Sequence, residues 1–470
     1  MNVRRVLFGL AAASLFLAPV FAPSLAQAAD VKVLDIGKGQ QVWFSEDHTL
    51  PMIAITASIP AGSAYDPAGK EGLATFAAAL LDEGAGKMDA HAFQTAMSDH
   101  AIRLSASPDH DSLVISMVTL SENANEAFRL LGLALSKPRF DESAINRVRQ
   151  QILASLKQSA SEPNSVAGRA FTRLFFRNHP YGHSVSGNLD SVVTINRADL
   201  RAFAKTHWVK AGLQVAISGD VDAATAKKLL REAFGKLPNT KPPSIADMKN
   251  PGAPGIHRVA LPVPQSTIIF GLPGIKHSDP DFLISYVANN ILGGGGFSSR
   301  LMNEVREKRG LTYGISTGVV PYAHGGVIIG QVATKNASVR ETIKVVRETM
   351  KKFAEDGPTA KELADAKTYL TGSFPLAFDS NTGITAQLNT FQRGGLSVGY
   401  IEKRNALINA VSLSDVRRVA ARLFNPAKLT IVVAGPLGAA KPASQPASKP
   451  ATQPAAPGPG TEPAAKAAAQ

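Results

Sequence analysis

The chain has 470 residues, no cysteine and a formal net charge of +13. The lack of cysteine excludes disulfides, thiol catalysis and cysteine-based metal sites. The basic residues are scattered and form no dense run with interleaved aromatic side chains, so a solvated basic surface is favoured over nucleic-acid binding. About 400 ordered residues are enough to bury a large core, and this length predicts two domains.

Residues 1–28 have the composition of a secretory signal peptide. Two arginines precede an apolar run, and Ala-Gln-Ala ends it at Ala28. A membrane anchor is the alternative, but Pro19 and Pro23 interrupt the short apolar run. We therefore predict cleavage after Ala28 and a soluble, exported, periplasmic mature chain without a membrane span.

The first half predicts alternating strands and helices. Apolar residues alternate from Ile53 to Ile59, which is typical of a strand with one buried face. A short buried helix is expected from Leu73 to about Leu81, stopped by Gly84. The same criteria predict a strand at 111–120 and helices at 122–136 and 141–159.

Polar residues in this half offer few sites. His179 and His183 are four apart, but the intervening proline and glycine argue against a helical metal pair. The Asp-His-Asp at 109–111 is expected to cap a turn. Asp82 and Glu83 are expected to be solvated acids at a helix end. The sequence has no Ser-His-Asp pattern, and a triad assembled in space is left as an open alternative.

An internal repeat joins the two halves. "DLRAFAKTHWVKAGLQVAISGD" and "DVRRVAARLFNPAKLTIVVAGP" align without gaps at a constant offset of 216 residues. Each copy predicts an amphipathic helix, a short loop and a buried strand that ends at glycine. The paired positions are Asp199 with Asp415, Arg201 with Arg417, Trp208 with Phe424, and Gly219 with Gly435.

Composition sets the domain boundaries. The Pro- and Gly-rich residues 238–255 predict a linker between an N-terminal domain (29–237) and a C-terminal domain (256–436). In the second half, strands are expected from Ser266 and at 326–334, with helices at 336–355 and 359–372. Residues 437–470 are rich in Pro and Ala, and predict an extended, disordered tail.

This pattern predicts an α+β fold. The duplicated unit of roughly 200 residues is expected to be an α/β sandwich, with helices packed on one face of a mostly antiparallel sheet.

The segment "GGGGFSSRLMNEVREKRGLTYGISTGV" contains an Arg and a Tyr seven residues apart, Arg306 and Tyr313. A serine at 298 or 299 is expected to cap a helix that starts near Arg300 and ends at Gly310, and a strand is expected to follow. A helix-end Arg and a strand-start Tyr could donate hydrogen bonds to one peptide oxyanion. The alternatives are an ion pair of Arg306 with a neighbouring Glu and a core position for Tyr313.

With these motifs, residues 33–436 resemble the pitrilysin/insulinase family of zinc peptidases, in its mitochondrial-processing-peptidase-like branch. The resemblance implies two homologous domains that form half of a clamshell around a peptide. It also implies that Arg306 and Tyr313 support a transition state in trans. Gly293, Gly294, Gly295 and Gly296 would form a mobile substrate-contacting loop, with a tight turn as the alternative. No G-K-[ST] follows these glycines, so nucleotide binding is not expected.

Active members of that family carry H-x-x-E-H, whose two His bind Zn²⁺ and whose Glu acts as general base, with a distal Glu ligand. The aligned segment "GLATFAAALL" has Thr75 and Ala79 at the His positions and Ala78 at the Glu position. The distal Glu position corresponds to Ser155, 76 residues after Ala79. No metal site is therefore expected in this chain.

The sequence favours the non-catalytic subunit of an exported heterodimeric zinc metallopeptidase. The chain would be inactive alone and hold no cofactor, and a homologous H-x-x-E-H chain would bring the zinc. The alternative is a non-enzymatic peptide-binding or scaffold protein of the same fold. A stand-alone peptidase that uses unrelated residues is the least favoured hypothesis.

Overall fold

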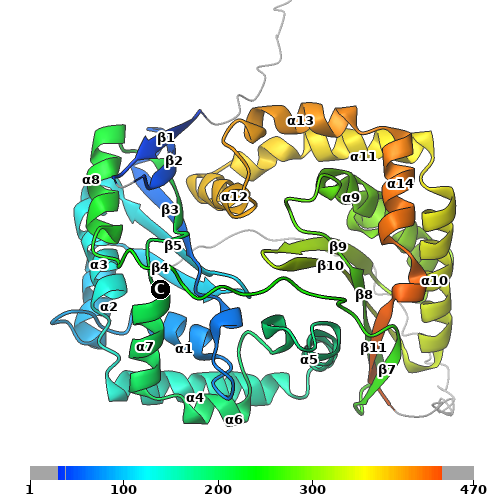
Figure 1. The fold of residues 1–470 in the computed structure, drawn as a ribbon, viewed down its shortest axis with the longest axis horizontal. Coiled ribbons are helices and arrows are strands. Elements are labelled where there is room, and N and C mark those ends of the chain that lie inside the picture. The colour runs from blue at the N-terminus through cyan, green and yellow to red at the C-terminus, as the bar shows by residue number, and fades with distance from the viewer. Residues whose placement is uncertain (1–29, 38, 437–470) are drawn as a thin grey trace, which may run out of the picture.

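The computed structural model describes residues 30–37 and 39–436, and contains two mixed sheets (Figure 1). The predicted signal peptide (1–28) and tail (437–470) lie outside these residues. The first sheet has the order β1-β2-β6-β3-β5-β4, with strands β1 (Val31–Asp35), β2 (Gln41–Glu46), β3 (Met52–Ile59), β4 (Arg103–Pro108), β5 (Leu113–Leu120) and β6 (Gln214–Gly219). The second has the order β7-β11-β8-β10-β9, with β7 (Gly255–Ala260), β8 (Gln265–Pro273), β9 (Ile315–Tyr322), β10 (Gly325–Lys335) and β11 (Thr430–Gly435).

The two sheets share one topology. In each, a single parallel pair (β2 with β6, β7 with β11) continues into three antiparallel strands. Strand β1 is an additional edge strand of the first sheet. The α+β prediction with mostly antiparallel sheets is therefore confirmed, and the internal repeat corresponds to a structural duplication.

The repeated helix–strand unit is also confirmed. Helix α7 (Arg197–His207) precedes β6, and α14 (Leu413–Leu423) precedes β11. The aligned acids complete matching capping boxes: Asp199 accepts from the backbone N–H of Asn196 at 2.9 Å, and Asp415 accepts from that of Ser412 at 3.0 Å. The repeat thus preserves the chemistry that starts each helix.

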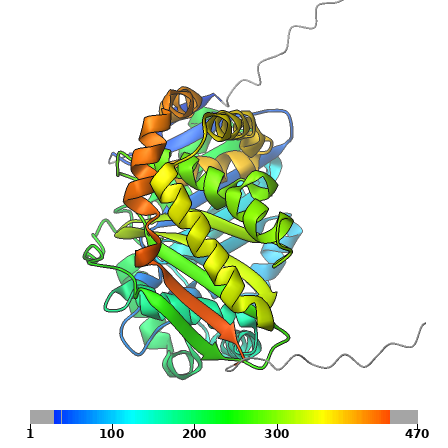
Figure 2. The ribbon, with the colours of Figure 1, turned by 90° about the vertical axis from the view of Figure 1, so that its right-hand side faces the viewer.

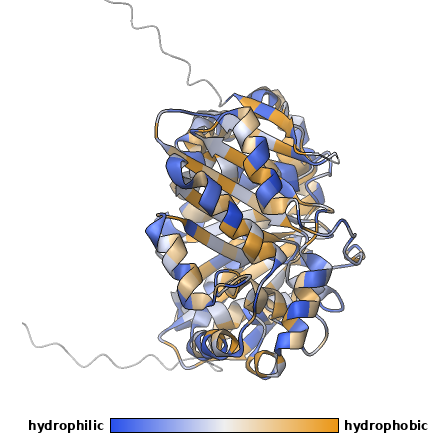
Figure 3. Ribbon diagram, turned by 90° about the vertical axis from the view of Figure 1, so that its left-hand side faces the viewer, coloured by the Kyte–Doolittle hydropathy of each residue, from blue (hydrophilic) through white to orange (hydrophobic). Residues whose placement is uncertain are grey.

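Most helices cover one face of their own sheet. The first core contains Ile53, Ile55, Ala57 and Ile59 of β3, as the alternation predicts. Around it lie α1 (Leu73–Ala79), α2 (Ala90–Asp99), α3 (Ala124–Ser136), α4 (Glu142–Ser159), α6 (Leu189–Thr194), α7 and α8 (Ala223–Phe234). Figure 3 shows that these elements mix hydrophilic and hydrophobic residues along their length.

The second core is built the same way. It contains Phe270 and Ile431 from the middle of the second sheet. Around it lie α9 (Phe282–Asn289), α10 (Val339–Asp356), α11 (Ala360–Gly372), α13 (Tyr400–Ala410) and α14. Figure 2 shows α10 and α14 side by side over this sheet, with β11 following α14.

The opposite face of each sheet is covered by a helix from the other half. Helix α5 (Pro163–Phe175) packs on β8 and β11, whereas α12 (Asn381–Arg393) packs on β3 and β6 (Figure 1). We expected helices on only one face of each sheet, but the structure has helices on both faces. Neither half completes its own sandwich, because each sheet takes its last helix from the other half.

The segment between the halves has no helix or strand from 238 to 254, and β7 begins at Gly255. Backbone hydrogen bonds nevertheless connect this segment to both halves. Met248 N–H donates to His324 O at 2.8 Å, and Gly252 N–H donates to Phe175 O at 2.8 Å. In the part of the chain that the structure describes, no helix is long and apolar enough to cross a bilayer.

Candidate functional site

Helix α1 (Leu73–Ala79) is stabilised at its start by the carboxylate of Asp66. Asp66 accepts backbone hydrogen bonds from Gly72 at 2.7 Å and Ala74 at 2.8 Å, which satisfies donors at the helix start. Burial raises the pKa of the Asp66 carboxyl to about 7. The helix ends at Ala79, two residues earlier than predicted, and Gly84 has a φ of +105° beyond it.

The aligned zinc positions on this framework carry no suitable donors. The Thr75 hydroxyl donates to Val185 O at 2.7 Å, Ala78 is buried and Ala79 is exposed. Ser155 lies exposed on α4, which contacts α1. Two alanines and two hydroxyls do not fit the imidazole and carboxylate ligands that Zn²⁺ requires. Elsewhere among the described residues, no group of three or more His, Asp or Glu side chains is arranged to hold a metal.

The acids after α1 are partly buried rather than solvated. Asp82 accepts from Gln94 Nε2 at 2.9 Å, and burial raises the pKa of its carboxyl. Glu83 forms an ion pair with Arg147 of α4. The expectation of free solvated acids is wrong, because α2 and α4 both reach this loop.

Arg306 lies in the π-helical segment Met302–Glu307. Its Nη1 donates to Glu307 Oε1 at 2.9 Å, so the predicted alternative of a neighbouring ion pair is present. Its Cζ also lies 4.7 Å from the centroid of the Phe297 ring. The guanidinium therefore has one stacked face and an edge from which it can donate further hydrogen bonds.

Tyr313 is 90% exposed and lies in the loop before β9. The alternative of a core position with a satisfied hydroxyl is therefore wrong. The strand begins at Ile315 rather than near Leu311, because Leu311 N–H is used by Val305 O at 3.0 Å and Gly310 turns the chain with a φ of +59°. The phenol is displayed to solvent, where a second molecule can reach it.

The glycine segment forms consecutive tight turns: the π-helical Asn290–Gly294 and the 3₁₀ turn Gly296–Ser298. A Cβ on Gly293 would lie 2.3 Å from Thr317 Oγ1, and one on Gly294 would lie 2.7 Å from Asn289 Nδ2. The segment is thus packed against a hydrogen-bonded Asn–Thr pair, which favours the tight-turn alternative for these two glycines. Gly295 meets Asn290 O, whereas Gly296, with a φ of +59°, has open space around it.

The serines after these glycines do not cap the next helix, contrary to the prediction. Ser298 Oγ donates to Gly295 O and Ser299 Oγ to Gly296 O, both at 2.8 Å. Their hydroxyls therefore stabilise the preceding turn.

The remaining polar candidates hold the halves together. His179 Nδ1 accepts from Tyr181 N–H at 3.2 Å, so its Nε2 carries the proton and donates to Ala246 O at 2.9 Å. Asp109 accepts from Asp111 N–H and Ser112 N–H, both at 2.8 Å, which confirms the predicted turn cap. Asp111 itself accepts from the Tyr181 hydroxyl and from Ala323 N–H of the second half.

One Ser–His contact is present, but it does not make a nucleophile. Ser63 Oγ lies 3.1 Å from His110 Nδ1, and Ser63 is fully buried. Burial lowers the pKa of His110 to about 4. A substrate carbonyl cannot reach this hydroxyl, so the pair is structural.

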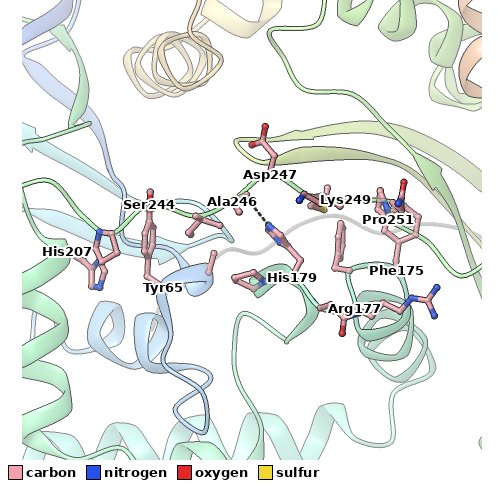
Figure 4. A pocket seen from close by; sticks show the side chains of 18 residues that line it. Tyr65, Phe175, Arg177, His179, His207, Ser244, Ala246, Asp247, Lys249 and Pro251 are labelled. Atoms are coloured by element: carbon pink, nitrogen blue, oxygen red, sulfur yellow. Dashed lines mark hydrogen bonds between the residues drawn. The ribbon is translucent and has the colours of Figure 1, made fainter.

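A cavity of about 870 Å³ lies under the linker (Figure 4). Its lining includes Tyr65, Phe175, His179, His207 and the linker around Ala246. His207 Nδ1 is buried without a partner among the described residues, and burial lowers the pKa of this side chain to about 4. None of the predicted site residues lines this cavity, and the sequence features that lie here are the Pro-rich linker and the loop of His179.

Comparisons with known proteins agree with this arrangement. A model of the insulinase family (peptidase family M16) matches residues 41–188, and a model described as the peptidase M16 inactive domain matches residues 194–370. The chain is 31% identical over 353 residues to a protein of Helicobacter pylori named non-peptidase homolog YmxG, covering 74% of this chain and 80% of that one. The chain belongs to the M16 peptidase family.

A solved M16 structure supports the same assignment. A peptidase M16 inactive domain from Pseudomonas fluorescens is 30% identical, with a TM-score of 0.82 over 88% of this chain and 99% of that one. A chain of complex III2 from Candida albicans shares the fold, with 16% identity and a TM-score of 0.72 over 86% of this chain and 96% of that one. With its ligand positions replaced, this chain is a catalytically inactive M16 homologue.

Proposed function

We propose that this chain is the non-catalytic subunit of an exported heterodimeric zinc metallopeptidase. A separate homologous chain with H-x-x-E-H would hold the zinc. This chain would contribute Arg306 and Tyr313, half of the peptide chamber, and Gly293–Gly296 as part of its substrate-contacting wall. The substrates would be unfolded peptides, since a closed clamshell excludes folded proteins.

The observation that carries the proposal is the contrast between α1 and the Arg306 region. The zinc-ligand positions on α1 carry no side chain that can bind zinc. In contrast, Tyr313 is 90% exposed, and Arg306, seven residues earlier, presents a guanidinium edge beside its stacked face. Phenol and guanidinium groups donate strong hydrogen bonds to a carbonyl oxygen as it gains negative charge.

Export to the periplasm is part of this proposal. It is supported by the composition of residues 1–28, which lie outside the described part of the chain.

The test is hydrolysis of an unstructured fluorogenic peptide by the mature chain, alone and mixed with an H-x-x-E-H homologue from a neighbouring gene. We expect activity only in the mixture, and loss of that activity with a chelator. Arg306→Ala and Tyr313→Phe should each lower kcat by about 100-fold, the usual effect of removing one oxyanion donor. Tyr369→Phe is the matched control, because Tyr369 is also exposed, at 59%, but lies on α11.

Full activity with Arg306→Ala and Tyr313→Phe would contradict the catalytic part. A demonstrated complex that hydrolyses nothing, despite a zinc-loaded partner, would favour the second candidate: a non-enzymatic peptide-binding or scaffold protein. The shared fold with a chain of the Candida albicans complex III2 supports that alternative. Absence of an exported H-x-x-E-H homologue near the gene would favour it too.

A further inference from the structure

Phe297 is an exposed aromatic side chain on a fixed backbone. Its residue is 70% exposed, although it sits between a glycine turn and the buried Ser299. Single exposed apolar residues are common, so exposure alone indicates nothing. Here, however, Gly293 and Gly294 are packed against Thr317 and Asn289, and hydroxyl hydrogen bonds of Ser298 and Ser299 to Gly295 O and Gly296 O close the turn around Phe297. The backbone therefore presents this ring to solvent in a defined place.

The ring also contacts the functional guanidinium. Arg306 Cζ lies 4.7 Å from the Phe297 centroid, within the range of a cation–π interaction. Glu307 holds the Nη1 end of the same guanidinium at 2.9 Å. Phe297 thus covers one face of Arg306, and the N–H edge that would meet a peptide carbonyl borders the ring.

This geometry determines what lies over the ring when a peptide binds. An extended peptide advances roughly 3.3 Å per residue. A carbonyl at the Arg306 edge would therefore place a side chain within one or two residues of Phe297. Aromatic rings pair with other aromatic rings and with large apolar side chains, while charged side chains would lose hydration there.

We propose that Phe297 is a specificity-determining residue that binds a large apolar or aromatic side chain of an extended peptide, next to the carbonyl held by Arg306. The inference rests on the proposed role of Arg306 in peptide binding. It adds a chemical preference to that role: the peptide class is unfolded segments with an aromatic or large aliphatic residue at one fixed position.

The experiment measures peptide binding to the isolated full-length mature chain by fluorescence anisotropy. The probes are unstructured, labelled 12-residue peptides, identical except for one guest position that is moved along the peptide as Phe or Ala. At one position we expect the Phe guest to bind at least about 10-fold more tightly than the Ala guest, since burying such a side chain has about this effect. Phe297→Ala should reduce this ratio to near one.

Two variants separate selectivity from general support of the site. Phe297→Tyr keeps a ring and should keep the ratio. Glu307→Gln removes the ion pair with Arg306 but leaves the ring, so it should also keep the ratio. Thermal unfolding of Phe297→Ala should match the parent chain, because the side chain is mostly exposed. Equal weakening of both guests by Phe297→Ala, an unchanged ratio, or no binding of either peptide would each overturn the inference.

Failure of this inference is distinguishable from failure of the proposed function. Binding to the isolated chain needs no zinc-bearing partner. If Phe297 sets the ratio but Arg306→Ala leaves hydrolysis by the mixture intact, only the catalytic proposal is wrong. If Arg306→Ala abolishes hydrolysis but Phe297→Ala leaves the preference for the Phe guest over the Ala guest unchanged, only the specificity role of Phe297 is wrong.

Discussion

Helix α5 lies against the second sheet mainly through apolar side chains, whereas α12 lies against the first sheet largely through hydrogen bonds. Phe171 and Phe175 of α5 stack with centroids 5.0 Å apart and pack with Ile269 and Val432. On α12, Thr385 meets Thr56 at 3.0 Å, and Asn381, Asn389 and Gln392 bond to β3 and β6. An apolar contact contributes stability with little directional demand, while buried amides fix the position of a helix because each lost partner is costly.

The comparison shows that one duplicated architecture uses two kinds of contact for the same task. Trp43, Leu388 and Phe391 still add an apolar cluster beside α12. The buried hydroxyls of Ser58 and Ser218 nevertheless have side-chain amides of α12 as partners. The α12 contact therefore specifies where the helix sits, and the α5 contact supplies more of the apolar burial.

The largest expected effect comes from removing the α5 aromatic contact. Phe171→Ala should destabilise the chain by about 3–5 kcal/mol, because the ring is 1% exposed and fills the space left by Gly271. Urea unfolding measures this change. Phe297→Ala is the matched control and should change the free energy of unfolding by less than about 0.5 kcal/mol. Equal stabilities of the two variants would contradict the apolar character of the α5 contact.

Acid should loosen the α5 side before the α12 side. His110 packs against Phe176 and Tyr181 near the end of α5, and burial lowers its pKa to about 4. The unfolded state therefore binds a proton more readily, and His110 removes stability as the pH falls from about 6.5 toward 4, by about 3 kcal/mol at most. The nearby Asp109 and Asp111 oppose this shift, while His179 and His183 reinforce it.

Unfolding free energies between pH 7 and 4 test this expectation. His110→Asn should flatten the profile relative to the parent chain, and His91→Asn, at an exposed position on α2, should not. The amide and hydroxyl groups that hold α12 do not titrate in this range. If hydrogen exchange showed that α12 opens before α5 on acidification, the comparison would be wrong.

A smaller effect is expected at α12. Asn389 Nδ2 donates to Ser58 Oγ and to Gln214 O, each at 3.2 Å. Asn389→Ala removes both hydrogen bonds and should lower the free energy of unfolding by about 1–3 kcal/mol. Thr390→Ala, on the exposed side of the same helix, should cost less than Asn389→Ala. Amide exchange along α12 should accelerate in the Asn389 variant more than along α5. Uniform acceleration in both helices would show that the two contacts open together.

Local patterns in the sequence predicted the repeated helix–strand units and the loss of the zinc ligands. Both depend on neighbouring residues: an amphipathic helix with its cap, or the residue types at fixed spacing. The exchange of α5 and α12 could not be predicted, because periodicity does not state which sheet a helix covers. Asn389 and Gln392 would be expected at a surface, but they are 2% and 8% exposed.

The roles of Arg306 and Tyr313 stay predictions, and the geometry around them could not be predicted from the sequence. The ion pair of Arg306 with a neighbouring Glu is present, at Glu307. The delayed start of β9 depends on the hydrogen bond between Leu311 N–H and Val305 O across a π-helical turn, which has no simple sequence pattern. Contact of Phe297 with Arg306 depends on the same turn.

The exchanged helices have a consequence for the order of folding. A nascent chain that has reached Gly255 contains α5 but not the sheet that α5 covers, and its own first sheet still lacks α12. Until nearly 390 residues have been made, the first half therefore lacks the α12 partners of its buried hydroxyls: Thr385 for Thr56, Asn389 for Ser58 and Asn381 for Ser218. Two fragments separated at the linker would need each other to become native, so the folding unit is the whole duplicated chain.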